Sequence, residues 1–523
     1  MIRTPVLTLL VACGLAAAQA HFDVVVYGAT SGGVIASIAA ARQGRSVALL
    51  EPGRHVGGMI SGGLGRTDMD RQQNVIGGMA REFFERVGRA YGQRVVWLFE
   101  PHVAEQTLTG WLHDAGVHVM FGKRLASVVK KGSRITTLET ADGDRFEAPV
   151  YIDGAYEGDL MKQAGVSYSV GRESTAKYGE SLAGRQDILP GAHQFRAPVS
   201  PYGPDGKLLP FITPQADVLP TGQGDGHVQS YCYRLCLTDK PANRIPIEKP
   251  ENYDPSEFTI ARNYVKALGD LIRVKDFLGI SRLPNGKSDV NSTGAVSTDV
   301  PSLSWRYVEA NENERQRIRK AHLDWAHGLL YFLAHDDGVP ESLRRQIGEW
   351  GLAKDEFVDT GHWPHQLYVR DARRMLGAYV LTQRDLTEQR SKPDSIGMAG
   401  YNIDIREVQW IAHRVYRFPR ADEEVLMEGY LSFPVDPWEI PYRALTPRES
   451  ECANLLVPVS ISASHVAFAS FRMEPQFMVA GQAAGVAAAL ASENGSPVQR
   501  IDVARLQKVL EDSRQILHLH PLN

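Results

Sequence analysis

The chain has 523 residues, of which 43% are hydrophobic and 23% charged, and its formal net charge is −4. This length is more than one simple hydrophobic core needs, so we expect two or three structural units. The balanced charge gives no general attraction to nucleic acid or to an anionic membrane, and we expect neither as a partner.

The first twenty residues have the composition of an export signal. A basic residue, Arg3, precedes an apolar run over 6–18, and AQA at 18–20 matches a cleavage site. This pattern predicts a secretory signal peptide over 1–20, which is too short for a stable transmembrane anchor. An alternative is a lipid tether at Cys13, because LVAC over 10–13 resembles a bacterial lipobox. In both cases we expect an exported protein, periplasmic or secreted.

A nucleotide-binding unit is predicted directly after this segment. The β-branched run over 22–27 predicts a strand buried in a parallel sheet, 34–41 predicts a helix, and 46–50 predicts a second strand. Glu51 follows at the distance where an acid accepts hydrogen bonds from a ribose. The turn between the first strand and the helix is rich in glycine, and its candidate cofactor residues are Gly28, Thr30, Ser31, Gly32 and Gly33. This order of elements predicts a Rossmann-type dinucleotide site.

The helix after the glycine turn should present free N–H groups and its positive dipole end to a pyrophosphate. Thr30 replaces the middle glycine of G-x-G-x-x-G and leaves less room for the backbone, although its hydroxyl could itself bind a phosphate. The next segment, PGRHVGGM over 52–59, resembles the R-x-x-G-G sequence of many FAD enzymes. The resemblance implies close passage of the backbone by the pyrophosphate and flavin, at Arg54, Gly57, Gly58 and Met59. SGGLG over 61–65 continues this glycine-rich path.

Two further segments fit the same nucleotide-binding pattern. A helix over 103–115 leads to a strand over 116–122, and the backbone of Leu125 just beyond it is expected to meet adenine. The segment 150–155 resembles the strand and turn that close the nucleotide site of FAD proteins, with Asp153 and Gly154 in the turn.

Near the C-terminus, a strand is expected over 454–459, followed by an Ala-rich helix that runs through 490. In flavoproteins of this layout the final helix directs its N-terminus at the flavin pyrimidine. The resemblance therefore implies cofactor contacts for Arg472, Gly481, Gln482 and Gly485. Close packing of the same small residues on the sheet is an alternative role, and both can hold.

Together these segments resemble the FAD-dependent oxidoreductase family whose members are often labelled xanthan-lyase-associated. The resemblance is carried by YGATSGGVIASIAAARQGRSVALLEP, HVGGMISGGLGRTD, FEPHVAE, IDGAYEGDLMKQAGVSYSVGRES, HQLYVRDARRM and NLLVPVSISASHVAFASFRMEPQFMVAGQAAG. The family implies an α/β fold, with a Rossmann-like FAD-binding domain that contains a parallel sheet, plus an inserted α+β substrate domain. It also implies FAD as the cofactor, but it supplies no settled substrate.

The glycine-turn pattern stops in the middle of the chain, so we predict an inserted substrate or cap domain over 168–444. The FAD-binding domain would then comprise 21–167 and a C-terminal return over 445–523. Within the insertion, 228–237 predicts a strand, whereas 312–334 and 369–382 have helical periodicity.

Candidate catalytic residues follow from what flavin chemistry requires, which is a positioned substrate and a base for its proton. His465 precedes the returning helix and is the candidate base, although a structural histidine is an equal alternative. His362 and His365 could line a polar substrate pocket, but no third ligand at a recognisable spacing suggests a metal. Arg370, Arg373 and Arg374 could clamp an anionic group, although at least one of the three should lie on the surface of the expected helix. Glu157 and Asp159 are expected to hold the turn after Asp153 together rather than to act as acid and base.

The leading hypothesis is an FAD-dependent dehydrogenase or oxidase that transfers hydride between the flavin and a small polar molecule, such as a sugar or hydroxylated metabolite. The electron acceptor is unknown. One alternative is a flavin monooxygenase, although the sequence contains no second glycine fingerprint for NAD(P)H. Another alternative is a carbohydrate-binding or lyase protein with a purely structural nucleotide fold.

Overall fold

The computed structural model describes residues 19–69, 72–189, 191, 193–389, 391–417 and 420–519. The predicted signal peptide lies almost wholly outside these residues, as does Cys13. The first described element is the strand β1 (Gln19–His21), which pairs in parallel with β7 (Arg145–Glu147).

A five-stranded parallel sheet forms the centre of the nucleotide-binding part. Its strand order is β23-β8-β2-β3-β4, and every pairing is parallel. The five strands are β23 (Leu455–Leu456), β8 (Val150–Asp153), β2 (Val24–Tyr27), β3 (Val47–Glu51) and β4 (His118–Phe121). β2 is wholly buried, as its continuous β-branched sequence predicts for a central parallel strand. The strands expected from the sequence in this part are thereby confirmed.

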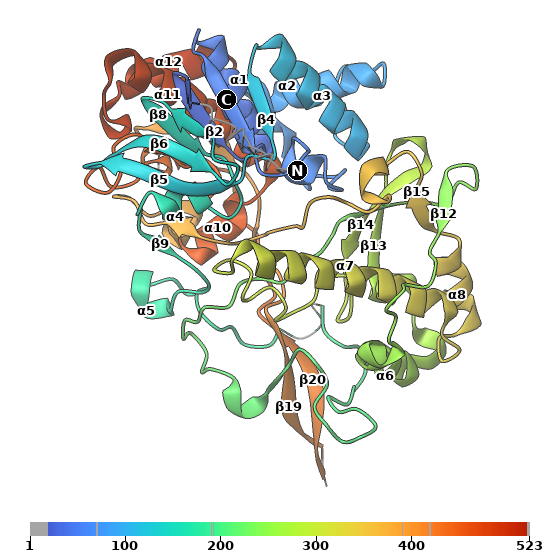
Figure 1. Ribbon diagram of the computed structural model, residues 1–523. Helices are drawn as coiled ribbons and strands as arrows, with labels where there is room; N and C mark the ends of the chain where they lie inside the picture. Colours follow the sequence, from blue (N-terminus) through green and yellow to red (C-terminus); the bar gives the residue numbers. More distant parts are fainter. Residues whose placement is uncertain are drawn as a thin grey trace, which may run out of the picture.

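Different layers cover the two faces of this sheet, because successive side chains of a strand point to opposite sides. Val24 and Val26 of β2 face a core shared with the helices, whereas Val25 and Tyr27 face a second sheet of order β1-β7-β6-β5. Figure 1 shows the N-terminal helix α1 beside the C-terminal helix α11. The helices and strands of this part of the protein also include α1 (Ser31–Arg42), α2 (Gly78–Ala90), α3 (Pro101–Asp114), β5 (Leu125–Lys131), β6 (Arg134–Thr140), α11 (Glu474–Asn494) and α12 (Val503–Asp512).

The middle of the chain forms an antiparallel sheet with helices, and it lies below the parallel sheet in Figure 1. The sheet has the order β12-β15-β11-β14-β13, and a hairpin of β19 and β20 projects away from the body. These elements are β11 (Leu235–Thr238), β12 (Arg244–Pro246), α6 (Thr259–Leu268), β13 (Leu278–Arg282), β14 (Lys287–Ser292), α7 (Glu312–His335), α8 (Glu341–Gly348), β15 (Gly351–Ala353), β19 (Gln409–Arg417) and β20 (Arg420–Glu428). The long helix expected over 312–334 is therefore confirmed as α7. The proposed boundaries at 167 and 444 remain predictions.

Short elements connect these layers. They are α4 (Asp159–Gln163), β9 (Tyr168–Ser169), α5 (Thr175–Tyr178), β10 (Ile212–Pro214), β16 (Arg374–Met375), α9 (Gln383–Thr387), β17 (Ser395–Ala399), β18 (Ile403–Ile405), β21 (Leu431–Phe433), β22 (Trp438–Pro441) and α10 (His465–Phe471). α10 and α11 follow each other directly and bring the C-terminal return to the nucleotide-binding part.

One sequence-based expectation for the middle of the chain is wrong, and a second is confirmed only at its end. The segment 369–382 is not a helix, because its backbone N–H groups bond outward: Met375 donates to the Ser460 carbonyl, and Leu376 donates to the Ser167 carbonyl. The strand expected over 228–237 begins only at Leu235. Before it, the N–H of Ser230 bonds to the Glu407 carbonyl, which diverts the chain from a sheet ladder. Contacts from distant segments override the local pattern in both places.

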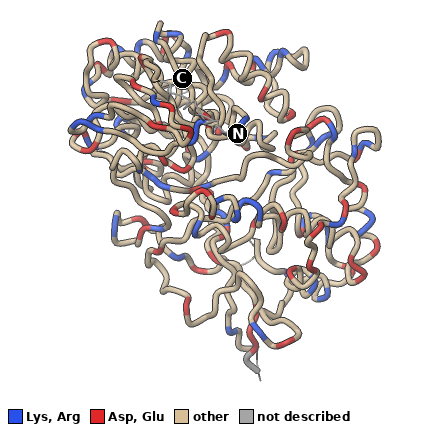
Figure 2. Tube along the Cα trace, viewed as in Figure 1, with Lys and Arg blue, Asp and Glu red and all other residues tan. Residues whose placement is uncertain are grey.

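Acidic and basic residues are interspersed along the chain trace in Figure 2, in keeping with the small net charge. None of the helices in the described part of the chain is both long and apolar enough to span a bilayer.

Candidate functional site

The glycine turn between β2 and α1 packs tightly against the turn after β8. Gly28 has φ +92°, and a Cβ atom there would come within 2.7 Å of the Ala155 nitrogen. A Cβ atom on Gly33 would lie 2.0 Å from the Gly28 carbonyl oxygen, so only glycine allows this approach of helix to strand. The Thr30 hydroxyl donates to the Gly154 carbonyl at 2.6 Å and accepts from the Gly33 N–H. Its single proton is therefore already used, which corrects the expectation that it binds a phosphate.

Glu51 is fixed by backbone groups at the edge of the sheet. One carboxylate oxygen accepts the Ala29 N–H at 2.8 Å, and the other accepts the Gly53 N–H at 2.6 Å. Burial raises the pKa of Glu51 to about 7, even though these hydrogen bonds lower it. Each oxygen retains acceptor capacity for a further hydroxyl donor.

A cavity of about 90 Å³ opens beside Glu51. It is lined by Ala29, Thr30, Glu51, Gly53, Arg54, His55, Gly58, His365 and Gln366. The lining thus combines the N-terminus of α1, the acid at the end of β3 and the R-x-x-G-G segment, as the sequence predicts. His365 and Gln366 come from the middle of the chain, and the sequence did not place them here.

A buried carboxyl links three predicted cofactor segments. Glu474, at the start of α11, accepts a hydrogen bond from the Ser31 hydroxyl at 2.5 Å and another from the Tyr156 hydroxyl at 2.7 Å. Tyr156 in turn accepts the Met59 N–H at 2.9 Å. Burial raises the pKa of Glu474 to about 7. The network ties α1, the Gly57–Met59 segment and α11 together.

The glycine-rich path after this segment packs against the middle of the chain. A Cβ atom on Gly62 would lie 2.4 Å from the Cβ of Gln366, and one on Gly63 would lie 1.9 Å from the Arg234 carbonyl oxygen. Gly58 faces Tyr156, whose hydroxyl would be 2.3 Å from an added Cβ. The glycines therefore allow close approach of protein segments at these positions.

The small residues of α11 face other helices rather than the cavity. A Cβ atom on Gly481 would lie 2.3 Å from the Gly32 carbonyl oxygen, and one on Gly485 would lie 2.2 Å from that of Ala36. The Gln482 side chain accepts the Met79 N–H of α2 at 2.7 Å. These contacts give the two glycines a packing role against α1, and Gln482 a structural role against α2.

Asp153 organises the turn after β8. Its carboxylate accepts the Ala155 N–H at 3.1 Å and the Met161 N–H at 2.8 Å, and burial raises its pKa to about 7. The Gly154 N–H donates to the Tyr27 carbonyl. The Leu125 N–H bonds to the Tyr27 hydroxyl at 3.2 Å, so this backbone donor is occupied within the protein.

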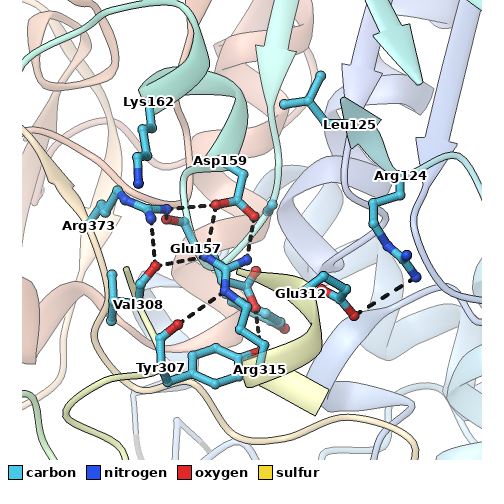
Figure 3. A network of polar contacts seen from close by, with 12 residues as sticks. Arg124, Leu125, Glu157, Asp159, Lys162, Tyr307, Val308, Glu312, Arg315 and Arg373 are labelled. Atoms are coloured by element: carbon cyan, nitrogen blue, oxygen red, sulfur yellow. Dashed lines mark hydrogen bonds and ion pairs between the residues drawn. The ribbon is translucent and has the colours of Figure 1, made fainter. Parts of the chain in front are cut away.

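Asp159 joins the nucleotide-binding part to the middle of the chain, as Figure 3 shows. Its carboxylate binds Arg315 of α7 through contacts of 2.6 and 2.9 Å, and Arg373 at 2.7 Å. Burial raises the pKa of Asp159, but the hydrogen bonds and charges of the two arginines lower it by more. The net shift of this pKa is therefore downward. Glu157 accepts the Tyr307 hydroxyl at 3.0 Å in the same network. These acids therefore reach further than the turn that they were expected to hold.

His465 is paired with a carboxylate in the interior. Its Nδ1 lies 2.6 Å from Asp371, and its N–H backbone group donates to Glu173 at 2.9 Å. Its Nε2 is buried and finds no hydrogen-bond partner among the described residues. Burial raises the pKa of Asp371, but the charge of Arg374 and the bond to His465 bring it below its usual value. An Nδ1–H donated to this carboxylate leaves Nε2 as the basic nitrogen.

The three arginines predicted as an anion clamp are locked in internal ion pairs. Arg370 binds Asp299 at 2.7 Å, Arg373 binds Asp159, and Arg374 binds Glu173 at 2.9 Å. Their side chains are 1%, 1% and 0% exposed, so the expectation that at least one is a surface residue is wrong. Because each guanidinium already has an acidic partner, the clamp is not supported for Arg370 or its neighbours.

His362 and His365 do not form one pocket wall. His362 lies 3.1 Å through Nδ1 from the Glu356 carbonyl and is half-buried. His365 lines the cavity beside Glu51 instead. The predicted flavin contact Arg472 bonds to the Tyr368 hydroxyl at 3.1 Å and to Asp404 at 2.7 Å.

Among the described residues, one group could ligate a metal ion by its chemistry: Glu100, His102 and Glu356. The ammonium of Lys287 lies 2.7 Å from Glu100 and 2.6 Å from Glu356. A fully buried lysine thus already supplies the positive charge at this point, and the group is an internal ion-pair cluster.

Comparison with known proteins identifies the family. The family model described as FAD dependent oxidoreductase matches residues 23–510. The chain belongs to this family. It is accordingly an FAD-dependent oxidoreductase, and its cofactor is FAD. A search of curated proteins finds no match to the sequence.

Solved structures similar to this oxidoreductase include three with 14–23% sequence identity. A flavoprotein/dehydrogenase from Cytophaga hutchinsonii is 20% identical, with 30% of this chain and 44% of that chain covered and a TM-score of 0.23. The 3-ketosteroid-Δ4-(5α)-dehydrogenase from Rhodococcus jostii RHA1 is 14% identical, with 29% of this chain and 50% of that chain covered and a TM-score of 0.20. The thioredoxin reductase from T. acidophilum is 23% identical, with 25% of this chain and 34% of that chain covered and a TM-score of 0.16. The match spans half or less of each of these chains.

The residues around the cavity have the donors and acceptors that the ribose–diphosphate part of FAD requires. Glu51 offers acceptors for ribose hydroxyls, and the N-terminus of α1 offers N–H groups and positive dipole charge. Arg54 adds a cation at the cavity. The site therefore fits the cofactor at its nucleotide end.

The sequence patterns did not indicate Tyr156, Glu474 or Asp371 as residues of the site. Glu474 directly follows Arg472-Met473 and could have been noticed as an acid at a predicted helix start. Asp371 gave no usable signal, because its partner His465 lies 94 residues away.

Proposed function

We propose that this FAD-dependent oxidoreductase is a dehydrogenase or oxidase that removes hydride from a small polar substrate, with His465 as the base. The observation that carries the proposal is the buried His465–Asp371 pair, in which His465 Nε2 has no hydrogen-bond partner among the residues that the structure describes. His465 is the one of the four catalytic candidates that keeps the arrangement of a general base. The proposed substrate class is a sugar or another hydroxylated metabolite.

In this proposal His465 Nε2 accepts the proton of a substrate hydroxyl. Asp371 holds the imidazole in the required tautomer and stabilises the positive charge that the imidazole gains. Bound FAD supplies the hydride acceptor when the substrate carbon is oxidised. The substrate thus loses one hydride from carbon and one proton from oxygen, and becomes a carbonyl compound.

The test is anaerobic mixing of the holoprotein with a panel of sugars, polyols, hydroxy acids and amines, while flavin absorbance is recorded. We expect bleaching with a hydroxylated compound. In H465N the rate of flavin reduction should fall about 10²- to 10⁴-fold, the usual contribution of a general base. The FAD content of H465N should equal that of the wild type.

An unchanged reduction rate in H465N would contradict the role of this histidine. NADPH-dependent oxygen uptake, without bleaching by any member of the panel, would instead favour a monooxygenase. D371N should show an intermediate loss, because the imidazole would remain but would lose its orienting anion.

We also propose that the protein is exported. Cleavage after Ala20 would leave His21 of β1 to pair with Glu147. Intact-mass analysis of the expressed protein should find an N-terminus at His21. A mature chain that begins at a lipidated Cys13 would contradict cleavage there.

A further inference from the structure

His365 is held firmly by its ring faces, but its ring nitrogens are unsatisfied. The imidazole stacks on His55, with ring centroids 3.8 Å apart and planes 8° from parallel, and Phe357 packs edge-on at 5.8 Å. His55 is itself fixed by Glu105 at 2.9 Å and by Asp359 at 3.2 Å. Both nitrogens of His365 are buried and lack a hydrogen-bond partner among the described residues. Most buried polar groups are hydrogen-bonded. It is therefore unusual that an imidazole fixed in place by packing has no described partner for either nitrogen.

The surroundings of His365 define what would pair with it. The ring lines the same cavity as Thr30, Glu51, Arg54 and Gly58. Burial, followed by the nearby charge of His55, lowers the pKa of His365 to about 3, so the apo ring is neutral. A neutral imidazole has one donor and one acceptor. Its partner should therefore supply both an acceptor and a donor.

The ribose–diphosphate part of a dinucleotide supplies this pair of groups. A ribose hydroxyl can donate to one ring nitrogen, and a phosphate oxygen can accept from the other. Glu51 and the N-terminus of α1 mark where these groups bind in Rossmann-type sites. We propose that His365 is a direct ligand of the ribose–diphosphate part of FAD, contributed by the middle of the chain. This inference rests on FAD binding and is independent of proton transfer to His465.

In this proposal, the segment 362–366 helps to hold the cofactor rather than to recognise the substrate. His365 and Gln366 then cover the nucleotide end of FAD, while Glu51 and Gly53 hold it from the sheet side. One residue from the middle of the chain would then complete the cofactor site.

The experiment uses the full apo chain and two probes, FAD and ADP. ADP carries the ribose and diphosphate but no flavin, so it reports only on the nucleotide end. FAD binding is followed by quenching of flavin fluorescence, and ADP binding by calorimetry. The variants are H365A and, as a matched stacked histidine outside the cavity, H335A, whose ring lies 4.5 Å from that of Tyr331.

We expect H365A to raise the Kd for both FAD and ADP by about 10-fold, the loss expected for one or two hydrogen bonds. H335A should leave both constants within about twofold of the wild type. Unchanged constants in H365A would overturn the proposal. A weaker affinity for FAD with an unchanged affinity for ADP would also overturn it, because His365 would then meet the flavin half.

If H365A does not fold, H365F provides the same test, because its ring can still stack on His55 but offers neither a donor nor an acceptor. Equal weakening of FAD and ADP relative to the wild type supports the proposal, and wild-type affinity for ADP overturns it. Either result is separate from the flavin-bleaching test of His465, since ADP binding involves no redox step.

Discussion

Glu474 shows how one buried acid can couple the cofactor segments to pH. It accepts hydrogen bonds from Ser31 on α1 and from Tyr156 after β8, and neither partner carries a positive charge. Glu51 and Asp153, in the same part of the protein, also have pKa values raised to about 7 by burial. Three acids around a site for an anionic diphosphate should therefore carry protons more readily than ordinary carboxyls.

This pattern predicts that the apo protein loses stability as pH rises. A folded pKa of about 7 against an ordinary value of 4.5 means that the folded state binds more protons between these pH values, so the free energy of unfolding falls as pH rises through 7. For Glu474 alone the change is on the order of 3 kcal/mol, at about 1.4 kcal/mol for each pKa unit.

E474Q should remove this contribution, because a glutamine amide carries no titratable charge; its oxygen can still accept one of the two hydroxyls, and its NH2 group can donate to the other. Urea denaturation of both proteins at pH 5 and pH 8 measures the effect. We expect a smaller loss of stability in E474Q between these pH values than in the wild type. The same loss in both proteins would show that Glu474 does not titrate in this range.

At the level of single residues, the sequence predicted the positions that form the cavity on the sheet side. Glu51, Arg54 and Gly58 lie where the motif placed them, because strand, turn and helix are consecutive there. It could not predict His365 in the same cavity. His365 and Glu51 are more than 300 residues apart in the sequence, so no local spacing of residues could predict that they line one cavity.

The elements predicted from sequence agree with the structure where one local pattern determines them. β2, α1 and β3 form from a β-branched run, a glycine turn and a small apolar segment. The helix predicted over 369–382 is absent for the opposite reason. Three buried arginines in this segment bond to acids on separate parts of the chain. Helical spacing of residues cannot reveal partners that lie elsewhere in the chain.

The helix pair α1 and α11 depends on glycine at the crossing. G485A should destabilise the protein by about 1–3 kcal/mol, because the added methyl group would lie 2.2 Å from the Ala36 carbonyl oxygen. G110A is the matched control on α3, where no described heavy atom outside the helix's own nearby backbone lies within 4 Å of the added methyl group. It should raise stability by about 0.5–1 kcal/mol through helix propensity.

Chemical denaturation of the two alanine variants distinguishes these effects. Equal changes in G485A and G110A would contradict the close crossing of α1 and α11.

In the whole molecule, the Asp159 network connects the turn after β8 to α7 and to Arg373 (Figure 3). The sequence predicted the order of these regions, but not this contact. Its residues come from three distant segments, and charge alone did not distinguish Asp159 from the many surface acids.

D159N should cost about 3–5 kcal/mol of stability, since it leaves two largely buried guanidinium groups without their shared anion. K162A is the control, because the neighbouring Lys162–Glu309 pair is 38% and 48% exposed and should contribute less than about 1 kcal/mol. Urea denaturation gives both values, and limited proteolysis should cut the middle of D159N faster. Similar stability in D159N and K162A would show that the network does not hold the regions together.

The most direct test of the account is titration of the apo protein with FAD, with the wild type compared to E51Q. The account predicts one FAD per wild-type chain and a flavin absorption spectrum. It also predicts a Kd about 10- to 100-fold higher in E51Q, because the glutamine amide has one acceptor oxygen where the carboxyl group of Glu51 has two. Failure of the wild type to bind FAD, or an unchanged Kd in E51Q, would contradict the cofactor site described here.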